Sequence, residues 1–163
     1  MKEIAVIGAR GNIKDPNTVI TYLQSLKDGI GIPLNADLVC GKDHLVSSVY
    51  HAMRSFERQE NVSGNLATEI LLYASGEKQI SHALEKMGIK AGYERIAIVL
   101  IGCVDIDEVL STLELQRDDS LLEFSVEKLR AFGIDERDII SLEPSELEDL
   151  ILEQVAFVDL IKG

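Results

Sequence analysis

A predicted corner between two helices carries the residues best suited to recognising a ligand. Ser75 and Gly76 separate an apolar helical pattern from an amphipathic one. Gly76 permits a close backbone approach, and a helix beginning near Glu77 would offer free backbone N–H groups. Lys78 and Gln79 add hydrogen-bond donors. The same residues can also form an ordinary turn, because glycine commonly follows a helix end.

A second polar surface is expected on a helix predicted over residues 42–58. Beside its apolar face runs a polar, partly cationic stripe made of His44, Ser47, His51, Arg54 and Arg58. A few such groups can bind a single-stranded nucleic acid, which proteins read by stacking and by hydrogen bonds to base edges and 2′-hydroxyl groups. A solvated helix face gives the same pattern, so both interpretations stay open.

One glycine-containing turn is partly typical of nucleotide-binding enzymes. Gly8-Ala9-Arg10-Gly11 follows a predicted strand, as dinucleotide-binding turns do. However, Lys14 occupies the position of the third glycine, and no proper βαβ unit follows. The turn alone is therefore a weak indication of an enzyme.

Other catalytic patterns can be weighed in the same way. Asp105, Asp107 and Glu108 could hold a magnesium ion, but Asp105 with Glu108 three residues later is typical of a helix N-terminus, and we favour capping. No serine, cysteine or threonine has a recognisable nucleophile setting, and no histidine has an identifiable carboxylate partner. We therefore expect no catalytic activity, no cofactor and no metal site.

The elements that must position these residues follow from the hydrophobic pattern. Two unbroken aliphatic runs, at residues 4–7 and 96–101, predict central strands that are covered on both faces. A helix is expected from Asp15 to about Lys27, closed by Gly29 and Gly31. The next expected elements are a short strand at 37–40, the helix at 42–58, two helices within 66–89, a helix at 105–115 and short irregular elements at 121–132. A capping box at Ser145–Glu148 begins the last helix, which runs to about Ile161. This order predicts an α/β fold: a small mixed β-sheet with flanking helices in a single compact domain.

Composition restricts the partners and the compartment. The 28 acidic and 16 basic residues give a net charge of −12, which opposes sequence-independent binding to nucleic acid backbones. No apolar run approaches the roughly 20 residues of a membrane helix, and the N-terminus runs into a strand pattern without a cleavable signal. We expect a cytoplasmic protein with no membrane contact. Cys40 and Cys103 each end an apolar run, which predicts buried free thiols.

The last predicted helix has more apolar surface than one core stripe needs. The core stripe comprises Leu147, Ile151, Val155 and Val158. Further apolar residues spread around its C-terminal half: Leu152, Ala156, Phe157 and Leu160. Either neighbouring loops cover this surface or a protein partner does.

Three segments together resemble a known family. The most specific segment comprises Thr68-Glu69-Ile70, Ala74-Ser75-Gly76-x-Lys78-Gln79-Ile80 and Ala83-Leu84-x-x-x-Gly88-Ile89. The second segment comprises Asp37-Leu38-Val39, His44-Leu45 and Ala52. The third segment is the apolar C-terminal helix. The chain resembles the Cgi-type, PRPK-binding regulatory subunit of the KEOPS/EKC complex, which makes threonylcarbamoyl-adenosine in transfer RNA. It departs from the family where members usually carry alanine at Ser48 and often arginine at Lys78, and lysine lacks the planar, bidentate fork of arginine.

The resemblance implies one such domain over residues 1–163 and a function for it. The chain would be a non-catalytic regulatory subunit that binds and stimulates the kinase-like ATPase of the complex and recruits transfer RNA through its single-stranded 3′ CCA end. The candidate transfer RNA-binding residues are Ser75, Gly76, Lys78, Gln79, His44 and Arg54. The candidate kinase-binding residues are Val155, Phe157 and Leu160. The alternative is a nucleotide- or dinucleotide-binding enzyme built on the turn from Gly8 to Gly11, which NADP or ATP would stabilise against heat.

Overall fold

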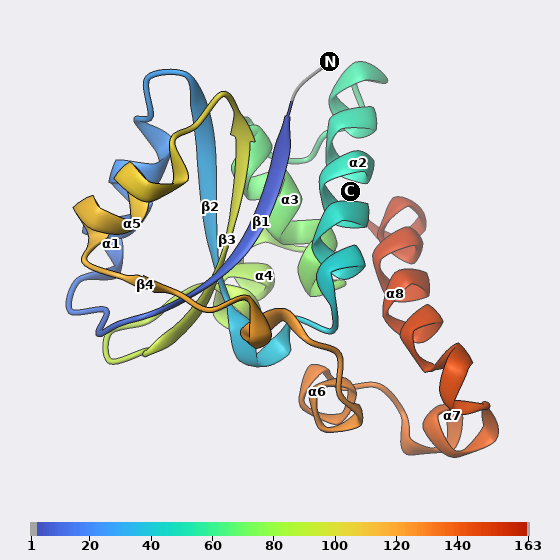
Figure 1. The fold of residues 1–163 in the computed structure, drawn as a ribbon. Coiled ribbons are helices and arrows are strands. Elements are labelled where there is room, and N and C mark those ends of the chain that lie inside the picture. The colour runs from blue at the N-terminus through green and yellow to red at the C-terminus, as the bar shows by residue number, and fades with distance from the viewer. Residues whose placement is uncertain (1–2, 163) are drawn as a thin grey trace.

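A four-stranded sheet forms the centre of the computed structural model, which describes residues 3–162 (Figure 1). In spatial order β2-β3-β1-β4, the strands are β1 (Ile4–Arg10), β2 (Gly29–Asn35), β3 (Arg95–Gly102) and β4 (Gln116–Arg117). β1 and β3 are therefore the central strands, as their aliphatic runs predict. The expected α/β class is confirmed, although the pairings among the described strands are all antiparallel, whereas the sequence predicts a mixed sheet.

Helices cover both faces of the sheet (Figure 1). One face carries α1 (Pro16–Gln24) and α5 (Ile106–Leu113). The other face carries α2 (Lys42–Glu57), α3 (Leu66–Ser75) and α4 (Ile80–Met87), with α8 (Leu147–Ile161) packed against α2 and α3. Because successive residues of a strand point to opposite faces, β3 sends Ile98 and Leu100 toward α1 and α5 and Val99 toward α2 and α3. β1 and β3 are covered on both faces, which explains their continuous apolar runs.

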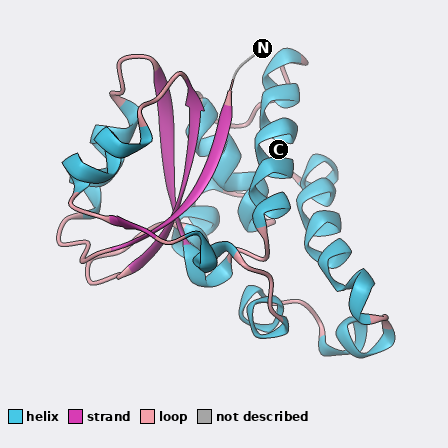
Figure 2. Ribbon diagram, viewed as in Figure 1, coloured by secondary structure: helices cyan, strands magenta, loops and turns pink. Residues whose placement is uncertain are grey.

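Short elements link the sheet to α8. They are the 3-10 helices Asp119–Leu122 and Pro144–Glu146 and the helices α6 (Val126–Phe132) and α7 (Glu136–Ser141). A further 3-10 helix, Ala36–Leu38, connects β2 to α2. Figure 2 shows α6 and α7 as short helices joined by loops, set to one side of the sheet. Their shortness explains why the sequence between residues 121 and 132 gives no clear period.

β2 is the element that sequence reasoning assigned wrongly. Gly29 and Gly31 lie within this strand and do not close α1, which ends at Gln24. A Cβ on Gly29 would lie 2.2 Å from the Ile101 carbonyl oxygen, and one on Gly31 would lie 2.8 Å from Leu23 Cδ2. These glycines therefore allow β2 to pack closely between β3 and α1. The strand expected at residues 37–40 is not formed, because this segment begins with a 3-10 helix.

Side-chain caps fix several helix starts. The carboxylate of Asp15 accepts the Asn17 backbone N–H at 3.1 Å, with Pro16 in the first turn as expected. Asp105 accepts the N–H of Glu108 at 3.2 Å, which confirms the capping interpretation of that residue. The capping box expected at Ser145 is not formed, since α8 begins at Leu147 without a side-chain cap.

Candidate functional site

The corner between α3 and α4 is formed at Gly76, where α3 ends. Asn65 caps α3 through the N–H of Thr68 at 2.8 Å, and Gly76 ends that helix with a φ of +71°. This left-handed conformation strains any residue with a Cβ. Gly76 is thus required by the backbone, as the sequence suggests for a helix end.

Two of the groups expected to bind a ligand at the corner are arranged differently from the prediction. Ser75 is buried, and its hydroxyl donates to the Leu72 carbonyl at 2.8 Å and accepts the N–H of Glu77 at 3.2 Å. Its side chain therefore cannot face a ligand as expected. α4 begins at Ile80, not near Glu77, so residues 77–79 form an irregular link. Lys78 and Gln79 are both exposed on this link.

Phe132 of α6 lies beneath the corner, and sequence reasoning missed it. A Cβ on Gly76 would lie 3.4 Å from Phe132 Cζ and 3.8 Å from Gln154 Cβ of α8. Lys86 Nζ lies 3.7 Å from the centroid of the Phe132 ring, as in a cation–π contact. Burial lowers the pKa of Lys86, although Glu77 opposes this effect. Nothing in the local sequence links Phe132 to Gly76, because the two are more than fifty residues apart.

His44 is buried and supports the corner from inside, which corrects its expected place on an exposed stripe. Its Nδ1 accepts the Cys40 backbone N–H at 3.0 Å, so Nε2 carries the proton and donates to the Ala74 carbonyl at 2.8 Å. Its ring also meets Phe132 edge-on, with centroids 5.5 Å apart. Burial lowers the pKa of His44 to about 4, so the imidazole is neutral at pH 7. His44 thus positions the end of α3 without reaching solvent.

Arg54 lies with α8 and not with the corner. It follows His44 by ten residues, roughly 15 Å along α2. Its guanidinium lies 2.8 Å from Nδ1 of His51 and 3.8 Å from the carboxylate of Asp159 in α8. The Tyr73 hydroxyl donates to the same carboxylate, and His51 stacks on the Tyr73 ring with centroids 5.4 Å apart. The structure therefore separates Arg54 from the other candidate RNA-binding residues.

The C-terminal half of α8 presents apolar side chains to solvent. Phe157 is 51% exposed and Leu160 is 78% exposed, as the sequence pattern allows. Val155 is fully buried, so its proposed place on this surface is corrected. Tyr50 of α2 is also 60% exposed, and sequence reasoning did not single it out.

A buried ion pair fixes the end of α8. Lys162 Nζ lies 3.0 Å from Oε2 of Glu69, and both side chains are nearly inaccessible to solvent. Glu69 also accepts the backbone N–H groups of Val62 and Ser63 and the hydroxyl of Ser55. Burial alone would raise the pKa of Glu69, but these donors hold it below its usual range. The exposed apolar side chains thus stand on an anchored helix.

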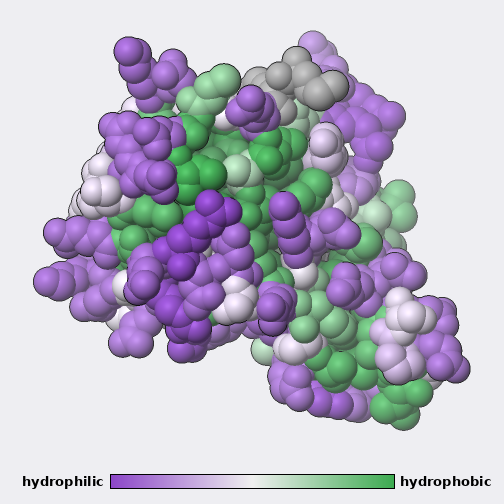
Figure 3. Space-filling view, in the orientation of Figure 1, coloured by the Kyte–Doolittle hydropathy of each residue, from purple (hydrophilic) through white to green (hydrophobic). Residues whose placement is uncertain are grey.

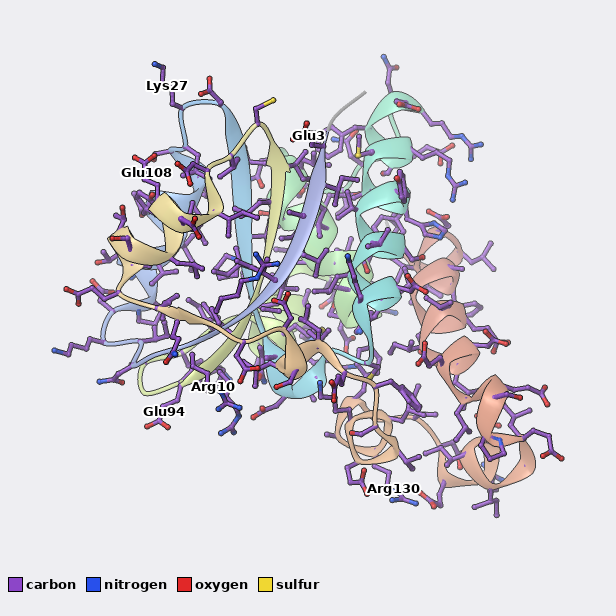
Figure 4. The ribbon with its side chains drawn as sticks, in the orientation of Figure 1. Glu3, Arg10, Lys27, Glu94, Glu108 and Arg130 are labelled. Carbon is purple, nitrogen blue, oxygen red and sulfur yellow. The ribbon has the colours of Figure 1, made fainter. Side chains whose placement is uncertain are left out.

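The turn expected from Gly8 to Gly11 is not formed, because Gly8, Ala9 and Arg10 belong to strand β1, and other parts of the chain pack closely against both glycines. A Cβ on Gly8 would lie 2.2 Å from the Asp118 carbonyl oxygen, and one on Gly11 would lie 2.5 Å from Leu115 Cδ2. Arg10 binds the carboxylate of Asp118 and lies near Glu94 at the same end of the sheet (Figure 4). β1 pairs antiparallel with both neighbours. The segment therefore lacks the parallel βαβ geometry of a dinucleotide-binding turn.

The two cysteines differ in their exposure. Cys40 is buried as expected, and burial raises its pKa to about 12, whereas Cys103 is exposed, contrary to expectation. Within residues 3–162 no three potential metal-ligating side chains gather together. No helix in the same range has the length and apolar character to cross a membrane.

Comparison of the sequence with known proteins identifies a family that it matches. The family model described as kinase binding protein CGI-121 matches residues 12–159. The chain is also 31% identical over 133 residues to the regulatory protein Cgi121 of Methanocaldococcus jannaschii, a match that covers 79% of this chain and 83% of that protein. The family match includes the corner and α8 as far as Asp159. The chain belongs to the CGI-121 family of kinase-binding regulatory proteins.

Proposed function

We propose that this protein is the regulatory subunit of a KEOPS complex in the cytoplasm, where it binds and stimulates the kinase-like ATPase and recruits transfer RNA for threonylcarbamoyl-adenosine synthesis. It performs no catalysis of its own. The observation that carries the proposal is the exposure of Phe157 and Leu160 on a helix whose opposite side is fixed in the core. Its family membership supplies the class of partner.

The kinase-binding surface consists of Phe157 and Leu160, which lie three residues apart on α8. Large exposed apolar side chains that adjoin each other mark interaction surfaces, and aromatic residues often dominate binding energy there. Because Lys162 and Val158 hold the other side of α8, the helix loses little conformational freedom on binding.

The RNA-binding surface consists of Gly76, Lys78 and Gln79, with Lys86 beside them. Gly76 lets an RNA strand approach the backbone closely, and Lys78 and Gln79 offer exposed donors. Lys86 adds a half-buried cation above Phe132. A single-stranded 3′ end suits this small site, because it requires few phosphate contacts.

The kinase arm of the test uses size-exclusion chromatography with light scattering. This protein and the kinase-like ATPase subunit from the same source should elute as one complex at micromolar concentration. Phe157→Asp should weaken association at least about tenfold, since it places a charge in the apolar contact. The matched control is Ile140→Asp, because Ile140 is 74% exposed on α7, in a region where Figure 3 shows a separate hydrophobic area. Separate elution of the wild-type proteins would refute the proposal.

The RNA arm uses fluorescence anisotropy with a labelled RNA dodecamer ending in CCA. Lys78→Glu should reduce affinity roughly fivefold to tenfold by replacing a charge-assisted donor with a repelling carboxylate. Lys90→Glu, at another exposed lysine, should change it less than twofold. Equal losses in both variants would indicate nonspecific attraction and would count against a site at the corner.

A further inference from the structure

β2 lies at one edge of the sheet, and its outer side has free hydrogen-bonding groups. Among the described strands it pairs with β3 alone. The Cys103 N–H donates to the Asp28 carbonyl at 3.1 Å, which sets the ladder so that Ile30 bonds to β3. Because bonded residues alternate along an antiparallel strand, the N–H and C=O groups of Gly29 and Gly31 point away from β3. Within residues 3–162, no other strand, turn or loop backbone pairs with these groups.

A groove runs along this free edge, between helices that cover the two faces of the sheet. Figure 1 shows β2 between α1 and α3. At the start of β2 the groove forms a wide hollow of about 820 Å³, a size typical of binding clefts. The apolar lining of the wide hollow comprises Leu26, Ile30, Leu66, Ala67 and Ile101. Beside Gly31 and Pro33 the groove narrows to about 60 Å³, and Gln24 of α1 and Ala67 of α3 line both parts.

The usable part of the free edge is short. Pro33 has no N–H, and proline in a strand is typical of an edge that resists further pairing. Gly31 and Pro33 are buried at the narrow end, whereas Gly29 is half-buried beside the wide hollow. The backbone groups that a partner can reach therefore begin at Gly29 and end at Gly31.

The recess of the edge restricts what can occupy it. A second copy of this chain would bring its own β2, which is recessed between the same helices, so the two edges cannot meet. A single extended polypeptide is thin enough to enter the groove. Its alternating N–H and C=O groups match those of Gly29 and Gly31, as when a peptide adds a strand to a sheet edge.

Charge favours a polypeptide over RNA in this groove. The charged residues that line the wide hollow are Glu3, Lys27 and Asp28, so carboxylates outnumber cations. Figure 4 shows Glu3 and Lys27 at the same end of the sheet. The net charge of −12 repels a phosphate chain and attracts a basic polypeptide segment.

We infer that the free edge of β2 binds an extended segment of a partner protein, which adds to the sheet as a further strand. The segment has apolar side chains at alternate positions, which enter the wide hollow beside Leu66, and basic residues at its ends. Main-chain bonds to Gly29 and Gly31 hold it, and the apolar side chains select it. This inference goes beyond the proposed function and does not rest on it, because neither proposed surface includes β2.

The probe is a fluorescein-labelled peptide, Lys-Ser-Leu-Ser-Leu-Ser-Lys, added to the full chain. Fluorescence anisotropy should show saturable binding. The peptide Lys-Ser-Ser-Leu-Leu-Ser-Lys has the same composition without the alternation and should bind at least about tenfold more weakly. No saturable binding of the first peptide up to about 1 mM overturns the inference.

Backbone methylation of the peptide tests strand pairing directly. In an added strand only every second residue bonds to its neighbour. N-methylation at one set of alternate positions should therefore weaken binding at least about tenfold, and at the other set by less than about threefold. Equal effects of the two sets would mean that the peptide does not bind as a strand, and the inference would be wrong.

Two reporters in the chain locate the bound peptide. Saturating peptide should slow amide hydrogen exchange at Gly29 at least about fivefold, because its N–H becomes bonded. It should also slow alkylation of Cys103 by iodoacetamide, since this exposed thiol lines the wide hollow, whereas Cys40 is buried. Binding that leaves both rates unchanged places the peptide elsewhere and overturns the inference.

A matched pair of variants tests the groove. Gln24→Trp should weaken peptide binding at least about tenfold, because Gln24 lines both parts of the groove and the larger indole would fill it. Thr21→Trp, at an exposed residue of α1 that lines neither part, should change the affinity less than about twofold. Equal affinities of the two variants would count against the groove as the binding site.

Two further results would assign the edge to another occupant and overturn the inference. One is a dimer by light scattering in which Gly29 is protected from exchange without peptide, which would indicate a second copy. The other is protection of Gly29 by the CCA dodecamer and not by the peptide, which would indicate RNA.

Discussion

At the scale of single residues, His44 shows how a polar side chain is retained in a core. It fills both of its hydrogen-bonding positions with backbone groups of Cys40 and Ala74. Each partner would otherwise be a buried unpaired group, at a cost of about 1–3 kcal/mol. The imidazole therefore ties the start of α2 to the end of α3, immediately before the Gly76 corner.

The way in which the free energy of unfolding changes with pH should reveal the contribution of His44. Burial lowers the pKa of His44 from 6.5 to about 4 in the folded chain. Between these pH values the unfolded chain binds a proton that the folded chain does not, so the free energy of unfolding falls as pH falls. Urea titrations should show a loss on the order of 3 kcal/mol from pH 6.5 to pH 4 attributable to this group.

The matched variants isolate that contribution. His44→Gln should be less stable at pH 7 and should lack this part of the pH dependence. His82→Asn, which alters an exposed histidine of α4, should keep the wild-type profile. A wild-type profile in His44→Gln would show that other groups cause the acid sensitivity.

At the scale of elements, α8 is anchored by charge at its end and by apolar packing along its length. Val155 and Val158 are fully buried, and the pair between Lys162 and Glu69 closes the C-terminal turn. A buried ion pair is costly to break because the remaining charge has no partner. This anchoring keeps the exposed face of α8 in one orientation.

Replacing Lys162 should measure how much its ion pair with Glu69 contributes to the free energy of unfolding. Lys162→Met leaves the Glu69 carboxylate buried without its cation and should lower the free energy of unfolding by roughly 3–5 kcal/mol. Lys78→Met, at an exposed lysine, should change it by less than about 0.5 kcal/mol. Chemical denaturation of both variants at pH 7 provides the comparison. Equal stabilities would mean that the ion pair does not hold α8.

At the scale of the whole molecule, the net charge of −12 limits how the proposed RNA partner could be bound. Long contacts along a phosphate backbone would meet carboxylates over much of the surface, so binding must rely on few phosphates. Lys78 lies on the link that follows Gly76, and Lys86 lies over Phe132 beneath the corner. This favours recognition of a short single-stranded end over binding to a duplex.

The salt dependence of RNA binding should therefore be shallow. With about two phosphates neutralised, the logarithm of the affinity for the CCA dodecamer should fall with the logarithm of salt concentration with a slope of about −1 to −2. Anisotropy titrations from low to high salt measure this slope, and Lys78→Glu should make it shallower. A slope steeper than about −4 would instead indicate a broad cationic surface.

Local signals in the sequence predicted much of the fold. Asp15 and Asp105 cap the helices that their positions indicate, because a cap depends only on residues two or three positions away. The aliphatic runs of β1 and β3 identified the two central strands. The corner at Gly76 was also found, since the left-handed helix end is a local property.

The sequence by itself thus determined the α/β class, the central strands, the corner and the excess apolar surface of α8. Only the tertiary structure placed β2 at Gly29 and Gly31, buried His44, Ser75 and Val155, set Arg54 beside Asp159 and brought Phe132 beneath Gly76. Helical spacing gives the face of a helix but not which neighbour covers that face. Those outcomes depend on contacts between distant segments, which no local pattern encodes.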